Sequence, residues 1–196
     1  MAALSILTKV VADLETAGLR FALVGGLAVS VWAEPRFTAD VDFAVTVAGD
    51  EAAEAICRTL GTYGYRTIST SEHESLDRLA AARLALSGTG IEPVVDLLFA
   101  SSGIEPEIVA GAAPIEILPG LVVPVASLGH LIALKLLSEN DATRPNDGAD
   151  LLALAAVCTE PDWRVTQDSI ALIRDRGFHR NRDLDAALVR LRLRTS

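Results

Sequence analysis

Two aspartates separated by one residue give the clearest chemical signal in this chain. Asp40 and Asp42 begin residues 40–47, which become apolar and β-branched and predict a strand. On a strand, such residues face the same side with Cα atoms about 6.5 Å apart. Two carboxylates roughly 5 Å apart repel by about 3 kcal/mol at an effective dielectric of about 20, and a divalent cation offsets this. The pair therefore predicts magnesium ligands, with a solvent-facing acidic strand edge as the alternative.

A third carboxylate, Asp96, lies in the middle of the apolar run 93–99. Burying it is costly unless it is paired or bound to a metal. One interpretation is a salt bridge to an arginine. The other places this run beside the strand of Asp40, where Asp96 completes a three-carboxylate metal site and helps to deprotonate an attacking hydroxyl.

Glycine and basic residues supply candidate phosphate contacts. Gly25 and Gly26 follow the predicted strand 21–24, so the backbone can approach a ligand, and the N–H groups of the next helix favour an anion. Lys135, in the apolar helix 131–137, is a point charge suited to phosphate, or a surface lysine that extends to solvent. Arg144 is a second triphosphate candidate, or a solvated loop charge.

The hydrophobic pattern predicts which elements hold these residues. Residues 4–17 predict a helix, 21–24 a strand, 27–33 a short helix, 40–47 a strand and 50–63 a helix. Residues 81–86 and 94–99 predict an antiparallel pair, and 114–125 short strands and turns. Helices are expected at 128–137, with Ser127 as N-cap, and at 147–158, 165–176 and 182–194. We expect an α+β fold, with a mixed α/β catalytic lobe at 1–125 and an all-helical lobe at 126–196.

Composition limits the classes of protein to consider. The 196 residues are 51% hydrophobic, enough for one large domain or a core with a helical extension. No apolar run has the roughly 20 residues of a membrane span, and the start lacks a signal-peptide pattern. Cys57 and Cys158 have no partners at metal-ligand spacing, which predicts core thiols rather than a disulfide or zinc site. We expect a cytoplasmic protein without membrane contact.

Charge is distributed unevenly along the chain. The net charge of −9 argues against a protein that coats nucleic acid, yet residues 174–196 hold seven arginines against three aspartates. Arg190, Arg192 and Arg194 spread around the predicted last helix, which suits phosphate contacts. The alternatives are a solvated helix face and an interaction with the acidic front lobe.

Two glycines, a short helix, Asp-x-Asp and a later single Asp on a strand form a pattern that resembles the polymerase-β-type nucleotidyltransferase superfamily. Within it, the Arg36-x-Thr38-x-Asp40-x-Asp42 stretch resembles the AbiEii group of toxins, including the MenT type. That group also has a helical lysine followed by an aspartate that opens a later helix, which Lys135 and Asp147 or Asp150 match. The resemblance extends from about residue 23 to residue 154.

This resemblance implies a role for each matching residue. Asp40 and Asp42 would be the magnesium ligands, Asp96 the third catalytic acid and metal ligand, and Lys135 the contact to the triphosphate or leaving pyrophosphate, with Asp150 as its partner. The implied nucleotide-binding residues are Gly25, Gly26, Ser30, Arg36, Thr38, Lys135 and Arg144. Many superfamily members have Gly-Ser in place of Gly25-Gly26, so either the Gly26 N–H or the Ser30 hydroxyl meets the phosphate.

The implied activity is magnesium-dependent transfer of a nucleoside monophosphate from an NTP to the 3′ end of tRNA. A pyrimidine nucleotide is one candidate for the NTP. Such a toxin blocks translation and has a cognate antitoxin protein. The alternatives are an aminoglycoside-like antibiotic nucleotidyltransferase and a catalytically inactive binding module. On an extended chain Thr38 would face the same side as the metal ligands, so we hypothesise that its phosphorylation silences the enzyme. The alternative is a threonine that favours the strand and has no regulatory role.

Overall fold

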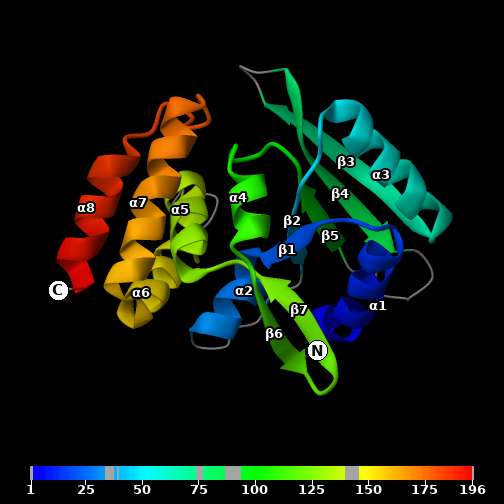
Figure 1. Cartoon of the computed structure of the whole chain (residues 1–196), viewed down its shortest axis with the longest axis horizontal. Helices are drawn as coiled ribbons and strands as arrows, with labels where there is room; N and C mark the ends of the chain where they lie inside the picture. Colours follow the sequence, from blue (N-terminus) through cyan, green and yellow to red (C-terminus); the bar gives the residue numbers. More distant parts are fainter. Residues whose placement is uncertain are drawn as a thin grey trace.

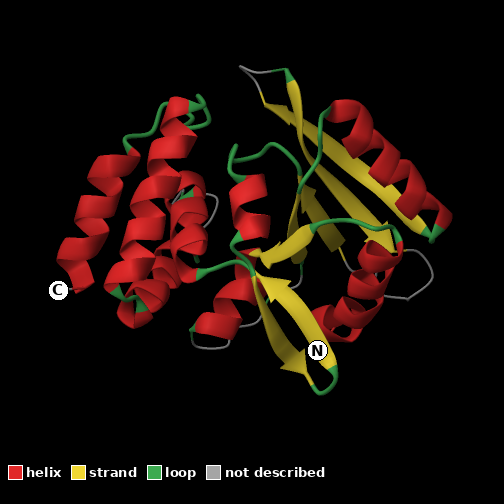
Figure 2. Ribbon diagram, viewed as in Figure 1, coloured by secondary structure: helices red, strands yellow, loops and turns green. Residues whose placement is uncertain are grey.

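The computed structural model describes residues 2–33, 38, 40–73, 77–86, 94–139 and 146–195. Its elements, drawn in Figures 1 and 2, follow the chain in this order: α1 (Ala2–Thr16), β1 (Phe21–Val24), α2 (Gly25–Trp32), β2 (Val41–Val45), α3 (Asp50–Thr62), β3 (Tyr65–His73), β4 (Arg78–Leu86), β5 (Val94–Leu98), α4 (Glu105–Ala110), β6 (Ala113–Leu118), β7 (Leu121–Val125), α5 (Leu128–Ser138), α6 (Asp147–Val157), α7 (Glu160–Asp175) and α8 (Leu184–Thr195). The α+β prediction is confirmed.

The seven strands form one mixed sheet in the order β3-β4-β5-β2-β1-β7-β6. β5 pairs with β2, and β7 with β1, in parallel, while the other neighbours are antiparallel. The central strands are apolar: β1 is buried at all four residues. The predicted antiparallel pair β4 and β5 is confirmed, and it brings β5 directly beside β2.

Two elements were not predicted from the sequence. β3 forms an edge of the sheet, and only its first residue, Tyr65, is buried. A strand with one buried residue gives no alternating pattern. α4 has six residues with Pro106 in its first turn, too few to establish a helical period.

Three helix starts were predicted too late. α1 begins at Ala2 rather than at residue 4, and α2 begins at Gly25 rather than at residue 27. α7 begins at Glu160 rather than at 165, because Thr159 and Asp162 form a capping box: Asp162 Oδ2 accepts from both the backbone N–H and the hydroxyl of Thr159. By contrast Ser127 caps α5 as predicted, accepting from the His130 N–H.

The helices after β7 pack around α5, as the left side of Figure 1 shows. α6, α7 and α8 all contact α5, while α2 contacts α5 and α6 and so joins this group to the sheet. One core cluster contains residues of both halves, among them Phe43 and Leu131. The division at residue 125 therefore stays a prediction.

Two arginines after α7 join the helices to the sheet side of the molecule, and a third joins α8 to α7. The Arg176 guanidinium pairs with Glu107 of α4 at 2.7 Å and holds the pKa of that carboxyl below its usual value. Arg180 donates to the Ser101 carbonyl at 2.8 Å. Arg192 pairs with Glu160 and lies over the Trp163 ring. For the last helix, an interaction with the acidic front lobe was one expected alternative, but Arg192 pairs with Glu160 of α7 instead. No ion pair joins Arg190 or Arg194 to another described residue.

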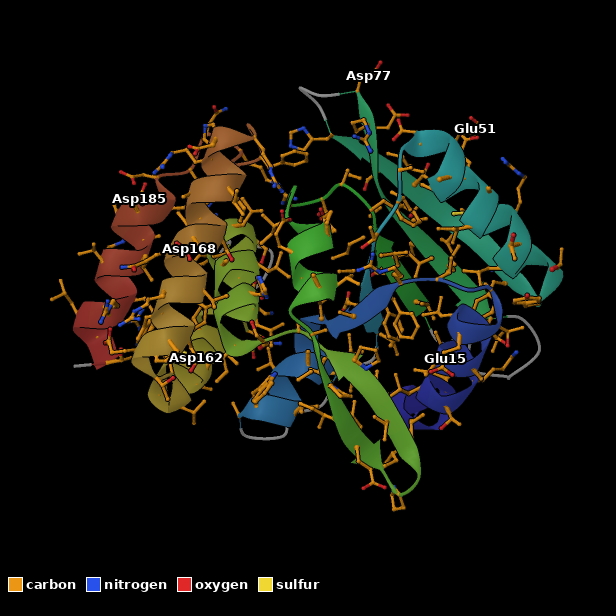
Figure 3. The ribbon with its side chains drawn as sticks, in the orientation of Figure 1. Glu15, Glu51, Asp77, Asp162, Asp168 and Asp185 are labelled. Carbon is orange, nitrogen blue, oxygen red and sulfur yellow. The ribbon has the colours of Figure 1, made fainter. Side chains whose placement is uncertain are left out.

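Some acidic residues are spread over the surface. Figure 3 labels six of them, which lie on α1, α3, α7 and α8 and in the turn before β4. Cys57 and Cys158 are free thiols, but they are half-buried against the core rather than within it, as had been predicted. Burial raises the pKa of both thiols, that of Cys158 to about 12. None of the described helices has the length and apolarity to cross a membrane.

Candidate active site

A cavity of about 610 Å³ lies between the sheet and the helical group. One wall consists of the end of β1, the start of α2 and strands β2 to β5, and the other consists of α5 and the start of α6. The polar lining residues are Thr38, Asp40, Asp42, Ser69, Thr70, Ser71, Arg83, Asp96, Ser101, Ser102, Lys135, Ser138, Asn146, Asp147 and Arg180.

The three predicted acids meet on the sheet wall. Asp42 and Asp96 are register partners on the parallel strands β2 and β5, so their side chains face the same side. Asp40 lies one residue before β2 and lines the same cavity. The adjacency of the two strands, on which the three-carboxylate prediction depends, is therefore observed.

Arg83 of β4 binds two of these acids. Its Nε and Nη2 donate to the two oxygens of Asp96 at 2.9 and 2.6 Å, and Nη2 also reaches Asp40 Oδ2 at 3.3 Å. Hydrogen bonding to Asp96, together with the charges of Asp96, Asp40 and Asp42, raises the pKa of this guanidinium although burial opposes the rise. Arg83 therefore stays a cation, and the alternative interpretation of Asp96 as an arginine partner holds at the same time.

The donor set suits a hard divalent cation. Carboxylate oxygens are the ligands magnesium prefers, and one Arg83 nitrogen touching both Asp40 and Asp96 shows that a single cation can reach both. Within the described residues, no three His, Cys, Asp or Glu side chains already have the compact arrangement of a metal site. Among the described lining residues, four acids face three basic side chains, so a triphosphate needs additional cations to enter.

Gly25 fits the backbone closely over Asp42. It has φ +64°, which glycine adopts without strain, and a Cβ there would overlap the Asp42 carboxylate. α2 starts at this residue, and no described side chain caps its first turn. Its N–H groups and the positive end of the helix dipole therefore lie beside the acids, at the edge of the cavity that Gly25 and Gly26 line.

Lys135 forms a buried charge cluster on the helix wall. Its Nζ contacts Asp147 at 2.6 Å and Asp150 at 2.7 Å. All three side chains are at most 11% exposed. Ser138 donates to the second oxygen of Asp147 at 2.9 Å. Lys135 is thus neither a surface lysine nor a bare phosphate ligand, because two carboxylates already surround it.

The two aspartates of this cluster have different positions. Asp147 lines the cavity together with Lys135, whereas Asp150 lies beneath them and is 2% exposed. The expected pairing of Asp150 with Lys135 is observed, and Asp147 shares it. Asp147 is the acid of the two that a bound ligand can meet.

The remaining predicted residues have mixed positions. Thr38 lines the cavity, and its hydroxyl lies 3.4 Å from the Asp40 carbonyl. Ser30 is not among the lining residues, and its hydroxyl donates to the Gly26 carbonyl at 3.0 Å, which favours the Gly26 N–H as the phosphate donor. Arg36 and Arg144 lie outside the described residues.

Sequence reasoning did not find Arg83, Arg180 or the hydroxyl groups of β3. Arg83 had a usable signal, since it is the one charged residue in the run Ala80-Ala81-Ala82-Arg83-Leu84. A charge inside an apolar strand calls for a partner, as Asp96 did. Ser69, Thr70 and Ser71 gave no signal, because exposed polar residues are common on edge strands.

Solved structures similar to this chain include a nucleotidyltransferase-like protein and an antibiotic-resistance factor. An antigenic nucleotidyltransferase-like protein from Paracoccidioides brasiliensis has 17% identity and a TM-score of 0.55, over 94% of this chain and 90% of that one. The antibiotic-resistance factor ANT(2″)-Ia has 17% identity and a TM-score of 0.56, over 90% and 94%. A second structure of ANT(2″)-Ia, in complex with adenylyl-2″-tobramycin, has 16% identity and a TM-score of 0.56, over 90% and 99%. The fold is therefore that of a nucleotidyltransferase.

The family follows from the sequence itself. The model of the family described as "Nucleotidyl transferase AbiEii toxin, Type IV TA system" matches residues 9–195. The chain belongs to this family of AbiEii nucleotidyl transferase toxins, as its motifs predicted. No curated protein sequence matches it.

Proposed function

We propose that the chain transfers a nucleoside monophosphate from an NTP to the 3′-terminal hydroxyl of tRNA, releases pyrophosphate and so blocks translation. The observation that carries this proposal is the pairing of Asp42 with Asp96 across parallel strands, in a cavity whose opposite wall presents Lys135. Family membership supports the toxin role and implies an antitoxin partner.

The position of each residue in the cavity suggests its role in the proposed reaction. The N–H groups at the start of α2 bind phosphate oxygens beside Asp42. Asp40, Asp42 and Asp96 would hold magnesium, which would neutralise these acids and polarise the phosphate under attack. Asp96 accepts the proton of the attacking hydroxyl, which bonds to the α-phosphorus as the bond to pyrophosphate breaks. Lys135 directs two of its three N–H groups to Asp147 and Asp150, and the third offsets charge on the leaving pyrophosphate.

A second candidate is nucleotidyl transfer to an aminoglycoside-like antibiotic. ANT(2″)-Ia shares the fold and forms an adenylylated tobramycin complex. The excess of acids in the cavity lining of this chain would also attract a polycationic drug. The two candidates differ in the acceptor rather than in the chemistry.

The test uses each labelled NTP with magnesium, and total tRNA or tobramycin as acceptor. We expect label in tRNA from the wild-type protein and none from Asp42→Ala. Label in tobramycin alone would replace the tRNA proposal with the antibiotic one. No transfer to either acceptor, and no pyrophosphate release, would support a binding module without catalysis.

A further inference from the structure

Arg83 lies where a metal ion is expected. Its guanidinium bonds both oxygens of Asp96 and also Asp40, so it neutralises the acids that the proposed reaction uses as ligands. Asp96 and Arg83 are also register partners on β5 and β4, which makes this contact a direct consequence of the strand pairing. The guanidinium and a divalent ion would compete for the same carboxylates, so each weakens the binding of the other.

We propose that Arg83 is a displaceable counter-cation: it neutralises Asp40 and Asp96 in the metal-free protein and must leave them when the divalent ion binds. The inference rests on the proposed function only for the identity of the incoming cation. Its consequence is that free metal binds weakly, and that an anionic nucleotide, by offering the guanidinium a new partner, promotes metal binding.

The structure allows Arg83 to move. Its side chain is 45% exposed, so reorientation needs no unfolding of the sheet. Ser69, its register partner on the edge strand β3, is a small exposed residue that lines the same cavity. The guanidinium therefore has a polar and open side to turn toward, still within reach of a ligand in the cavity.

A purely structural salt bridge is the competing explanation, and Arg78 shows what one looks like. Arg78 lies on the same strand and pairs with Asp50 at 2.9 Å with its side chain 40% exposed, but it does not line the cavity. Arg78 and Arg83 thus form a matched pair. They have similar exposure and the same strand, but only one of them contacts the proposed metal ligands.

The experiment measures Mn²⁺ binding by calorimetry, without nucleotide, to the wild-type protein and to Arg83→Gln, Arg83→Lys and Arg78→Gln. Loss of a two-pronged charged contact should tighten Mn²⁺ binding to Arg83→Gln roughly tenfold. Arg83→Lys keeps the charge but loses the two-pronged contact, so its affinity should be intermediate. Arg78→Gln should match the wild type. Arg83→Gln binding no tighter than wild type, or Arg83→Lys identical to wild type, would overturn the proposal.

A second measurement follows Arg83 in the wild-type protein. Its Nε–H resonance, assigned by its absence in Arg83→Lys, should shift toward that of a solvated arginine as Mg²⁺ is added. An unchanged resonance at saturating Mg²⁺ contradicts displacement. These readouts separate the two proposals: the predicted Mn²⁺ affinities without NTP turnover would support this inference and contradict the function, while turnover with unchanged Mn²⁺ affinity in Arg83→Gln would do the reverse.

Discussion

On the sheet wall of the cavity Arg83 bridges two aspartates with its side chain 45% exposed, and on the helix wall Lys135 bridges two aspartates with its side chain 11% exposed. The composition of the two clusters is alike, but their surroundings differ. Water screens the charges of the first cluster and can replace its contacts, whereas the second cluster is largely shielded from water. Exposure thus separates a cluster that a ligand can rearrange from one that fixes the geometry.

Deleting the cation from each cluster should give the largest contrast. Lys135→Met removes the cation that lies between two buried carboxylates and should lower the free energy of unfolding by about 3–5 kcal/mol. Arg83→Gln removes a half-exposed contact and should cost at most about 1 kcal/mol. Urea unfolding followed by circular dichroism measures both. Equal losses in the free energy of unfolding would show that the exposure of the two clusters does not change their contribution to stability.

Gly25→Ala tests how tightly the sheet wall is built. The positive φ of residue 25 makes any side chain costly, by about 1 kcal/mol, and the added Cβ would also push Asp42 aside. Displacing a ligand by about 1 Å reduces turnover roughly 100-fold. Gly18→Ala is the control, since Gly18 has φ +68° and open space around its Cβ position. It should lose similar stability but no activity, and if it loses activity as well, the contact with Asp42 is not the cause.

Thr38→Glu adds a negative charge near the cluster of Arg83, Asp40 and Asp96. Thr38 lines the cavity, and a further negative charge there should repel the triphosphate and reduce turnover tenfold or more. Thr38→Val keeps the size without the charge and should retain activity. Full activity of Thr38→Glu would refute the hypothesis that phosphorylation of Thr38 silences the protein.

The free energy of unfolding should depend slightly on pH through His130, which lies in the first turn of α5 on the helix wall of the cavity. Burial lowers the pKa of His130, and nearby Glu107 only partly opposes this. Below the usual histidine value of about 6.5, the unfolded chain takes up a proton that the folded chain resists, so stability falls as pH falls. Unfolding at several pH values should show a shallower decline for His130→Gln. An unchanged slope would contradict this.

The sequence predicted the central sheet and its acids because each left a strong pattern. Apolar strands and the Asp-x-Asp spacing identify β1, β2 and β5, and Asp96 was conspicuous in an apolar run. β3 was missed because an exposed edge strand buries too little to show a period. The spacing of residues within short segments therefore predicted the central strands that carry the acids better than the edge of the sheet.

Charge pairing was harder to predict because it depends on strand register and helix packing. Lys135 and Asp150 were expected to lie together, yet only the packing of α5 against α6 shows that Asp147 takes part and faces the cavity. Arg83 meets Asp96 through the register of β4 with β5, which no local pattern specifies. Arg190, Arg192 and Arg194 of the last helix were considered as phosphate contacts, and of these Arg192 has its partner, Glu160, within the protein.

The claim that both walls act on one nucleotide is tested most directly by hydrogen exchange with and without a non-hydrolysable NTP and Mg²⁺. We predict slowed exchange at the start of α2, around Gly25 and Gly26, and at the end of α5, around Lys135 and Ser138. Asp42→Asn should lose both effects, while Asp168→Asn, a surface change on α7, should keep them. Protection of one wall alone, or of neither wall in the wild-type protein, would contradict the account.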